Sequence, residues 1–330
     1  MRLLKSLTKS SIFGISLAFI ALCLAIGGIE AIIKENPVFF TSPNLLNILL
    51  QTAINTIIAV GMTFIIITAG IDLSVGSLLA LCNVIMGLTM LHFSANNAVA
   101  QIFFGILAAL IVGSVIGFFN GFISVKWSIP PFIVTLGMLG IARGLGLYAI
   151  HSQTENLIGR VTNAFSYLGN GSLFSIPFPA VVAIFIVIIA HILLNFTRFG
   201  RYAIAIGANE TAAKLSGINT GRYKTAVYIF GGLLVGVAAV IQTSRLGSAN
   251  PTIGSGFELY AIAAVIIGGT SLMGGEGTII GTLIGALIIG VLNNGLTLMN
   301  IPDEIKQIII GAVIIIAVML DRLRRKNGAT

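Results

Sequence analysis

The chain has 330 residues, of which 57% are hydrophobic and 8% are charged, and its mean hydropathy is +1.06. A soluble protein needs more charge than this to cover its surface, so the composition excludes a soluble globular domain and predicts an all-α polytopic membrane protein. The formal net charge of +8 is explained by loops that face anionic membrane lipid, and it does not indicate nucleic acid as a partner.

The first expected helix lies close to the N-terminus. A short basic segment precedes an uncharged run from Ile12 to Ile29, which is also the pattern of a signal peptide. No soluble domain that would need export follows, and the run is long enough to span the membrane. We therefore expect a membrane helix with a cytoplasmic N-terminus, and a cleaved signal peptide is the alternative.

Ten segments are expected to span the membrane, which places both termini on one side. Thirteen of the 18 Lys and Arg residues, among them Arg2, Lys5 and Lys9, then lie on the inner side and four lie outside, with Arg143 inside the fifth segment. This distribution follows the positive-inside rule, so both termini and the loop 198–224 are predicted to be cytoplasmic. The ten segments are approximately 12–33, 45–69, 74–92, 99–124, 132–150, 179–197, 225–244, 258–273, 277–297 and 305–321.

Two glycine-rich polar stretches are expected to break the helices. In the first, GIDLSVG, Asp72 is the only acidic residue between Glu35 and Glu155, and it is suited to cap a helix that begins at Leu73. A charge-dependent role is the alternative, because ionisable residues at membrane depth are often functional. The second stretch, GGTSLMGGEG, ends near the next helix start. The candidate residues of the two breaks are Gly70, Asp72, Ser74, Gly76, Gly268, Gly269, Gly274, Gly275 and Glu276.

The loop 198–224 is the only long polar interval with a dense charge cluster. It contains five basic residues and Glu210. Its middle predicts a short helix, with Asn209 as the N-cap and Gly217 as the stop. Such a helix at the membrane surface is suited to dock a soluble partner, and a solvated loop with one helical turn is the alternative. On the outer side, the long loop from His151 to Pro177 is expected to form either a docking surface or a cap over the helices.

Small and polar residues within the spans suggest how the helices pack and what they enclose. Glycines recur at four-residue spacing, as in Gly113, Gly117 and Gly121, which allows close helix packing in lipid, mostly within the chain. Neither a cluster of charges for an ion relay nor a P-loop for ATP is found in the sequence. The scattered amides and hydroxyls that could line a polar path are Asn55, Thr63, Thr68, Asn83, Asn120, Thr135, Gln242, Ser271, Asn293 and Asn294.

Three long motifs in this order resemble the ribose-type permeases, which are membrane subunits of bacterial ABC sugar importers. They are GMTFIIITAGIDLSVGSLLAL (Gly61–Leu81), GRYAIAIGANETAAKLSGIN (Gly200–Asn219) and the glycine-rich stretch Ala261–Leu296. The similarity extends from about Asn36 to Asp321. It implies one permease domain over residues 1–330, multi-pass insertion in the bacterial inner membrane, and import of a monosaccharide such as ribose or a related pentose or hexose.

The resemblance also implies partners. They are a second permease subunit (identical or closely related), an external solute-binding protein and a cytoplasmic ATPase, surrounded by membrane lipid. ATP and magnesium would be used by that ATPase, so no cofactor and no enzymatic site are expected in this chain. Ala212, Ala213 and Leu215 are expected to be buried against the ATPase, although Thr211 interrupts the importers' E-A-A…G pattern. The coupling residues that the resemblance implies are Gly207, Asn209, Glu210, Ala212, Ala213, Leu215 and Gly217.

Three other classes compete with this interpretation. An ion-coupled secondary sugar transporter usually carries buried ionisable residues, which are sparse here, and a passive channel needs no long basic docking loop. A membrane-embedded enzyme needs a clustered nucleophile or metal set, and the isolated histidines and cysteines of this chain do not form one.

Overall fold

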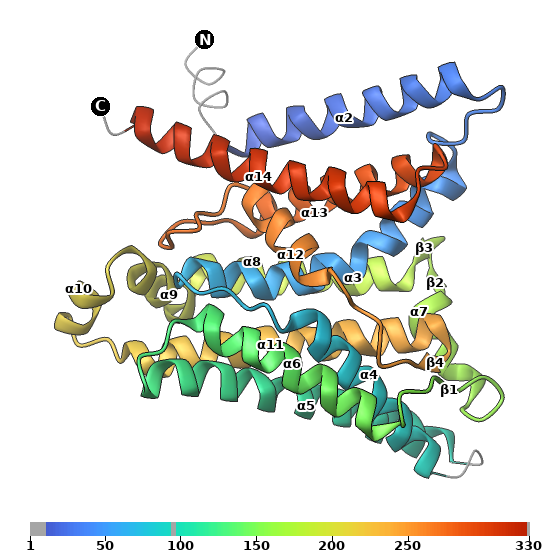
Figure 1. Cartoon of the computed structure of the whole chain (residues 1–330), viewed down its shortest axis with the longest axis horizontal. Coiled ribbons are helices and arrows are strands. Elements are labelled where there is room, and N and C mark those ends of the chain that lie inside the picture. The colour runs from blue at the N-terminus through green and yellow to red at the C-terminus, as the bar shows by residue number, and fades with distance from the viewer. Residues whose placement is uncertain (1–10, 94–96, 329–330) are drawn as a thin grey trace.

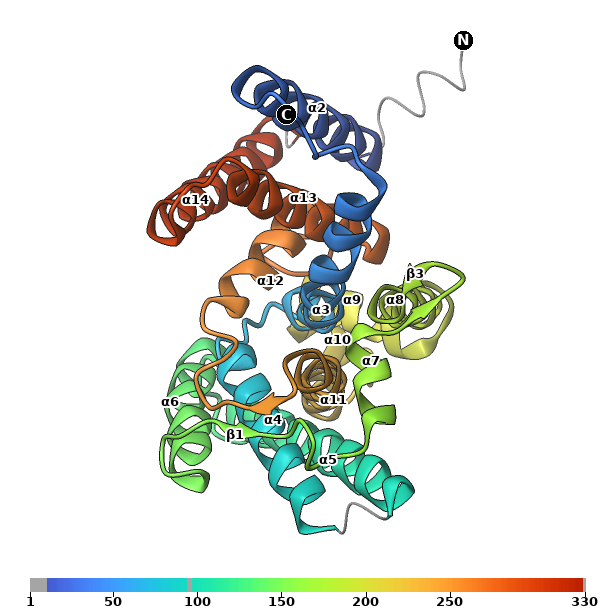
Figure 2. The same cartoon turned by 90° about the vertical axis from the view of Figure 1, so that its right-hand side faces the viewer.

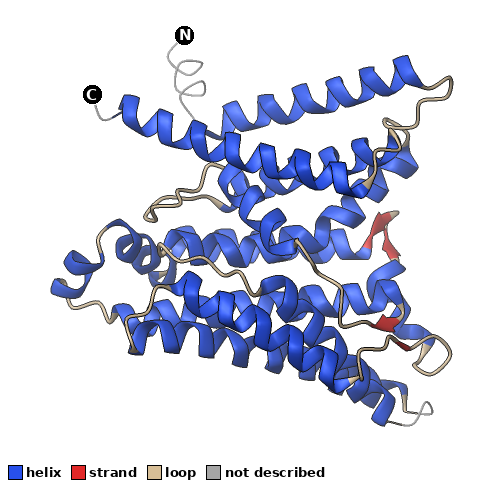
Figure 3. Ribbon diagram, viewed as in Figure 1, coloured by secondary structure: helices blue, strands red, loops and turns tan. Residues whose placement is uncertain are grey.

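The computed structural model of the chain describes residues 11–93 and 97–328 and is almost wholly helical (Figures 1 and 3). Ten longer helices match the ten expected segments, so the predicted fold class is confirmed. Arg2, Lys5 and Lys9 lie outside the described residues. The ten helices are α2 (Ser11–Ile33), α3 (Ser42–Ile67), α4 (Val75–His92), α5 (Ala98–Lys126), α6 (Pro131–Ala149), α8 (Phe178–Phe196), α11 (Thr220–Leu246), α12 (Phe257–Ile267), α13 (Ile279–Leu298) and α14 (Asp303–Gly328).

The remaining elements are short, and all but β4 lie in the two longest connections, between α6 and α8 and between α8 and α11. Two small antiparallel pairs of strands lie at one end of the bundle, shown red in Figure 3. The helices α9 and α10 form the opposite end (Figure 1). The short elements are β1 (Glu155–Asn156), the 3-10 helix η1 (Asn163–Ser166), α7 (Tyr167–Asn170), β2 (Ser172–Leu173), β3 (Ile176–Pro177), α9 (Arg198–Ala208), α10 (Glu210–Leu215) and β4 (Ser248–Ala249).

Eight helices in the described part of the chain are long and apolar enough to cross a membrane: α2, α3, α4, α5, α6, α8, α11 and α13. Helix α12 is different, because it has only 11 residues. At 1.5 Å per residue it is about 16 Å long, roughly half the thickness of the hydrocarbon core. The expected segment 258–273 is therefore wrong at its C-terminal end. The helix stops at Ile267 because Gly269, with φ of +84°, starts the glycine-rich break.

The core of the bundle is formed by α3, α4 and α11, and α11 lies between α3 and α5 (Figure 2). Glycines allow the closest of these packings. A Cβ at Gly113 would collide with the carbonyl oxygen of Gly232, and a Cβ at Gly121 would lie 2.7 Å from the Cα of Thr225. The glycine spacing on α5 therefore serves packing within the chain, as predicted.

The ends of the bundle agree with the expected grouping of loops. The start of α2 and the end of α14 lie at the end that carries α9 and α10, whereas the strands and α7 lie at the other end (Figure 1). The loops 198–224 and 151–177 are thus on opposite sides of the bundle. We call them the α10 end and the β-strand end.

Candidate functional site

Helices α9 and α10 form a hairpin that is fixed by its own caps. Thr197 begins α9 by accepting a hydrogen bond from the Gly200 amide at 3.4 Å. Asn209 ends α9 and begins α10, and its Oδ1 accepts from the Ala212 amide at 2.9 Å. At the other end, Gly217 has φ of +82° and the Ile218 amide bonds back to the Ala213 carbonyl at 3.1 Å. The predicted cap and stop of this short helix are confirmed.

The side chains of α10 face in different directions. Leu215 is 86% exposed and Ala212 is also exposed, but Ala213 is only 4% exposed. The prediction that all three present one contact to a partner is therefore wrong for Ala213, because the chain itself buries that methyl group. Ala212 and Leu215 remain available at the surface, and an exposed leucine on a polar hairpin is suited to dock another protein.

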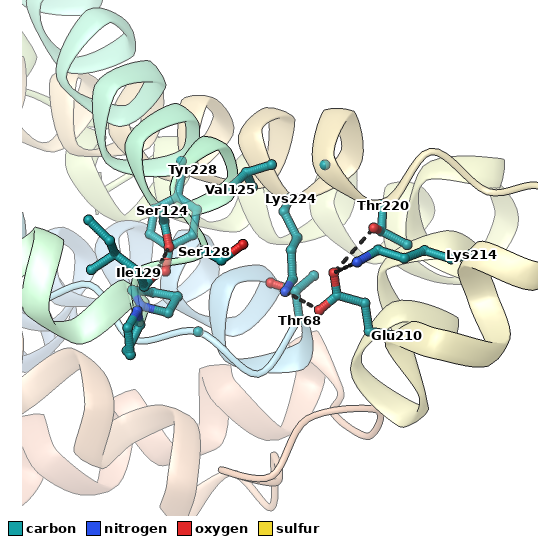
Figure 4. Close-up of a pocket in the computed structure, with 15 residues that line it drawn as sticks. Thr68, Ser124, Val125, Ser128, Ile129, Glu210, Lys214, Thr220, Lys224 and Tyr228 are labelled. Atoms are coloured by element: carbon teal, nitrogen blue, oxygen red, sulfur yellow. Dashed lines mark hydrogen bonds and ion pairs between the residues drawn. The ribbon is translucent and has the colours of Figure 1, made fainter.

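Glu210 ties this hairpin to the core helix α11 (Figure 4). Its carboxylate pairs with Lys214 at 3.1 Å and with Lys224 of α11 at 2.5 Å, and it accepts from the Thr220 hydroxyl at 3.2 Å. Partial burial by itself raises the pKa of the Glu210 carboxyl, but the hydrogen bonds and charges of Lys224 and Lys214 outweigh it and hold that pKa below its ordinary value. The carboxylate is therefore charged at neutral pH, and its ion pair with Lys224 holds α10 against α11.

These residues form one wall of a cavity of about 370 Å³. The cavity is bounded by the ends of α3, α5, α10 and α11 and by the α5–α6 connection, and Figure 4 shows Lys224 between Glu210 and the side that carries Tyr228 and Ser124. It opens between the hairpin and the first glycine-rich break, since Thr68 and Gly70 also line it. Movement of the hairpin would therefore change the shape of this cavity.

The first break is held by a buried polar cluster. Asp72 accepts from the Ser74 amide at 2.8 Å and from the Ser74 hydroxyl at 2.6 Å, while Asn120 of α5 donates to Asp72 at 3.3 Å and to the Ser74 hydroxyl at 3.0 Å. Helix α4 begins at Val75 with Ser74 at the N-cap position. The prediction that Asp72 caps a helix beginning at Leu73 is therefore wrong, because the carboxylate instead fixes the residue that precedes the helix.

The second break contacts the hairpin at the end of α9, and the contact is between backbone atoms. The Gly275 amide donates to the Ile67 carbonyl at 2.8 Å. A Cβ at Gly275 would lie 2.8 Å from the Cα of Ala208, and one at Gly207 would collide with the carbonyl oxygen of Ile67. We call these contacts of Gly207–Ala208, Ile67–Ala69 and Gly274–Gly275 the glycine junction.

The glycine junction brings together residues that the sequence placed in two separate groups. Gly207 came from the predicted coupling segment, and Gly274 and Gly275 came from the predicted second break; both glycines of the break have positive φ, +85° and +77°. Glu276 is exposed at the same break, and Thr278 is the N-cap of α13. Because the junction consists of backbone contacts, side-chain rotation cannot absorb a displacement of the hairpin relative to the end of α3 before the first break or relative to the second break.

Two other residues predicted for the breaks, Gly76 and Gly268, are not part of the glycine junction. Gly76 lies far along the chain from the hairpin and allows α4 to approach Gly254, whose carbonyl a Cβ at Gly76 would meet. Gly268 likewise allows the end of α12 to approach α13, because a Cβ at Gly268 would lie 2.5 Å from the carbonyl carbon and oxygen of Gly281. Sequence reasoning did not assign Thr220, Lys224, Tyr228 or Ile67 to this site. Lys224 was visible in the charge cluster, but nothing in the sequence pairs it with Glu210.

Comparison with known proteins assigns the family. The family model described as "Branched-chain amino acid transport system / permease component" matches residues 44–318. The chain belongs to this permease family. Its relatives include the ribose import permease protein of Bacillus subtilis (strain 168), 46% identical over 288 residues, and that of Escherichia coli (strain K12), 44% identical over 292 residues. These alignments cover 87% of this chain and 87% of the first relative, and 88% of this chain and 89% of the second.

More distant relatives match over a similar length. The D-allose transport system permease protein of Escherichia coli (strain K12) is 37% identical over 289 residues, covering 87% of this chain and 86% of the relative. No solved structure gives a significant match. The family and the resemblance to ribose-type ABC sugar permeases, both expected from the sequence, are confirmed, and this permease is a multi-pass membrane protein.

Proposed function

We propose that this permease is the membrane-spanning subunit of an ABC importer for a monosaccharide, with ribose as the first substrate and related pentoses or hexoses as the next. The substrate proposal is supported by the ribose import permeases at 43–46% identity, compared with 37% for the allose and fructose permeases. The observation that carries the mechanism is the glycine junction, which links an exposed hairpin to the end of α3, directly before the first break, and to the second break.

The proposed assembly has a partner at each end of the bundle. A separate ATPase, which uses ATP and magnesium, docks at the α10 end in the cytoplasm, and a sugar-loaded binding protein docks at the β-strand end outside. A second permease subunit completes the membrane part. Both chain termini are then cytoplasmic, which agrees with the position of the start of α2 and the end of α14 at the α10 end in Figure 1 and with the distribution of Lys and Arg.

The mechanism follows from the rigidity of these contacts. Closure of the ATPase displaces α10, and the Glu210–Lys224 ion pair passes the displacement to α11. The glycine junction passes it to the end of α3 and to the loop between α12 and α13. Since packed elements rearrange between discrete positions, this displacement favours one access state of the permease over the other. No covalent chemistry on the sugar is required of this chain.

Reconstitution tests the proposal against the two alternatives. Vesicles that contain the permease, its ATPase and its binding protein should accumulate labelled ribose only when ATP is enclosed with the ATPase and the loaded binding protein is outside. Accumulation driven by an ion gradient in vesicles without the ATPase would support a secondary transporter. Equilibration without any energy source would support a passive channel, and either result would overturn the proposal.

A further inference from the structure

A second polar cavity lies at membrane depth, away from the α10 end. Its volume is about 210 Å³, and it is enclosed by α3, α11, α12 and α13. The last turns of α11 before Leu246, next to β4, form part of its wall, so it lies in the half of the bundle nearer the β-strand end. Its lining consists of Gln51, Thr52, Ile54, Asn55, Gln242, Arg245, Phe257, Tyr260, Ala286, Ile289, Gly290 and Asn293.

Unpaired hydrogen-bond acceptors gather in this cavity. Among the described residues, Thr52 Oγ1, Asn55 Oδ1 and Gln242 Oε1 are buried atoms without a hydrogen-bond partner, and all three belong to the lining. A buried polar atom without a partner costs free energy, so most such atoms in folded proteins are paired. Three such atoms around one cavity are suited to accept hydrogen bonds from a molecule that enters it.

On α3 and α13, the neighbouring polar residues on either side of the cavity are paired. Nearer the β-strand end, Asn44 of α3 and Asn294 of α13 exchange hydrogen bonds at 3.1 Å and 3.0 Å. Nearer the α10 end, the hydroxyls of Thr63 and Thr282 lie 2.7 Å apart on the same two helices. The cavity lies between these two pairs, where α3 and α13 do not satisfy each other's polar groups.

The lining fits a small neutral molecule with many hydroxyl groups. Each sugar hydroxyl can donate to one of the three orphan acceptors, and the Arg245 guanidinium can donate to a sugar oxygen. Arg245 is the only charged residue of the lining, so nothing there favours a cation. Phe257 and Tyr260, whose ring centroids lie 6.2 Å apart, supply apolar surface for the carbon face of a sugar ring. The volume is below the roughly 300–1,000 Å³ of drug-sized sites, which favours a monosaccharide.

We infer that this cavity is a contact site for the monosaccharide during its passage through the permease, with Asn55 and Gln242 as the residues that bind its hydroxyls. This inference rests on the proposed function and extends it, because it places sugar recognition in the membrane subunit as well as in the binding protein.

Apolar replacements of similar shape test the inference. In the complete complex with ATPase and binding protein, Asn55→Leu and Gln242→Met should each lower ribose uptake at least about tenfold, because a site built for hydroxyls loses an acceptor. ATP hydrolysis stimulated by the loaded binding protein should stay within about twofold of wild type, since the hairpin and the glycine junction are untouched. Asn195→Leu is the matched control; this exposed amide on α8 bonds only to His191 and does not line the cavity.

A stability measurement separates sugar contact from a structural role. Asn55 Oδ1 and Gln242 Oε1 accept no hydrogen bond from the chain, so their replacement removes no such bond. Both variants should therefore melt at or above the temperature of wild type in detergent. A lower melting temperature, or uptake equal to that of Asn195→Leu, would overturn the inference. An equal loss of uptake and stimulated hydrolysis would also overturn it. Failure of the wild-type complex to take up ribose, in contrast, would refute the proposed function rather than this site alone.

Discussion

The glycine junction can be tested by adding a single methyl group. Gly275 and Gly217 both have positive φ, +77° and +82°, so replacement by alanine carries the same left-handed backbone cost of about 1–2 kcal/mol at each. Their surroundings differ. A Cβ at Gly275 would lie 2.8 Å from the Cα of Ala208 and 2.9 Å from its amide nitrogen, whereas a Cβ at Gly217 meets nothing within 4 Å.

The difference between the two variants therefore isolates the contact with the hairpin. Overpacking of this kind typically costs about 1–3 kcal/mol, and backbone atoms cannot rotate away as a side chain would. If that cost is relieved by moving the hairpin, an equilibrium between access states shifts by a factor of about 5–150. Gly275→Ala should thus lose sugar uptake while the ATPase remains bound and hydrolyses ATP, and Gly217→Ala should transport at close to the wild-type rate.

The assay is uptake in vesicles, normalised to the amount of permease and of bound ATPase in the same preparation. Both variants should reach the membrane at similar levels, because neither position lies within a membrane-spanning helix. Equal uptake by the two alanine variants would refute the argument, because it would show that the Gly275–Ala208 contact transmits nothing.

Three further predictions follow from the site. Leu215→Asp should release the ATPase without lowering permease levels, because Leu215 is 86% exposed, whereas Ala213→Glu should lower the level of folded permease, because Ala213 is buried. Co-purification of the ATPase and the amount of permease in the membrane distinguish these outcomes. The reverse pattern would contradict the orientation of α10. The folded-state pKa of Glu210 is lowered, so its ion pairs should hold the hairpin at every pH above the ordinary value of 4.5 and be lost only as the pH falls through the lower folded value. A spin label at Thr211 should therefore stay immobile from about pH 8 down to 4.5 and become mobile only at lower pH, and in Glu210→Gln it should be mobile throughout; a mobility change near neutral pH would contradict the assignment. Asp72→Ala should destabilise the permease by about 1–3 kcal/mol because it leaves the Ser74 amide and hydroxyl without their acceptor and removes one of the two acceptors of Asn120, while Asp72→Asn keeps an acceptor for Ser74 and should still transport. A folded Asp72→Asn variant without transport would instead indicate a charge-dependent role.

The helices of this permease could be predicted because a membrane imposes a length and a composition on each of them. Apolar runs with few charges located the ten helices that match the expected segments, and the helix α10 followed from Asn209 and Gly217, whose roles depend on local chemistry alone. The end of α12 could not be predicted in this way. Leu272 and Met273 continue the apolar character past Ile267, and only the backbone conformation of Gly269 ends the helix earlier.

The candidate site was predicted in parts but not as a whole. Ala212 and Ala213 are chemically identical, so their opposite exposure depends on how α10 packs against the bundle. The glycine junction joins Gly207 to Gly275, and a contact between backbones leaves no characteristic side chain for a sequence to display. The amides Asn55, Gln242 and Asn293 were recognised as candidates for a polar path, but their gathering around one cavity depends on the crossing of helices distant in sequence.

Site-specific crosslinking at the two ends of the bundle tests the central claim most directly. Leu215 at the α10 end and Phe174 at the β-strand end are 86% and 90% exposed, so each can carry a photo-crosslinker after Cys23 and Cys82 have been replaced. In the assembled importer, the label at position 215 should crosslink to the ATPase and the label at position 174 should crosslink to the binding protein. Crosslinking of position 215 to the binding protein, or of position 174 to the ATPase, would contradict the proposed direction of the permease and its coupling through α10.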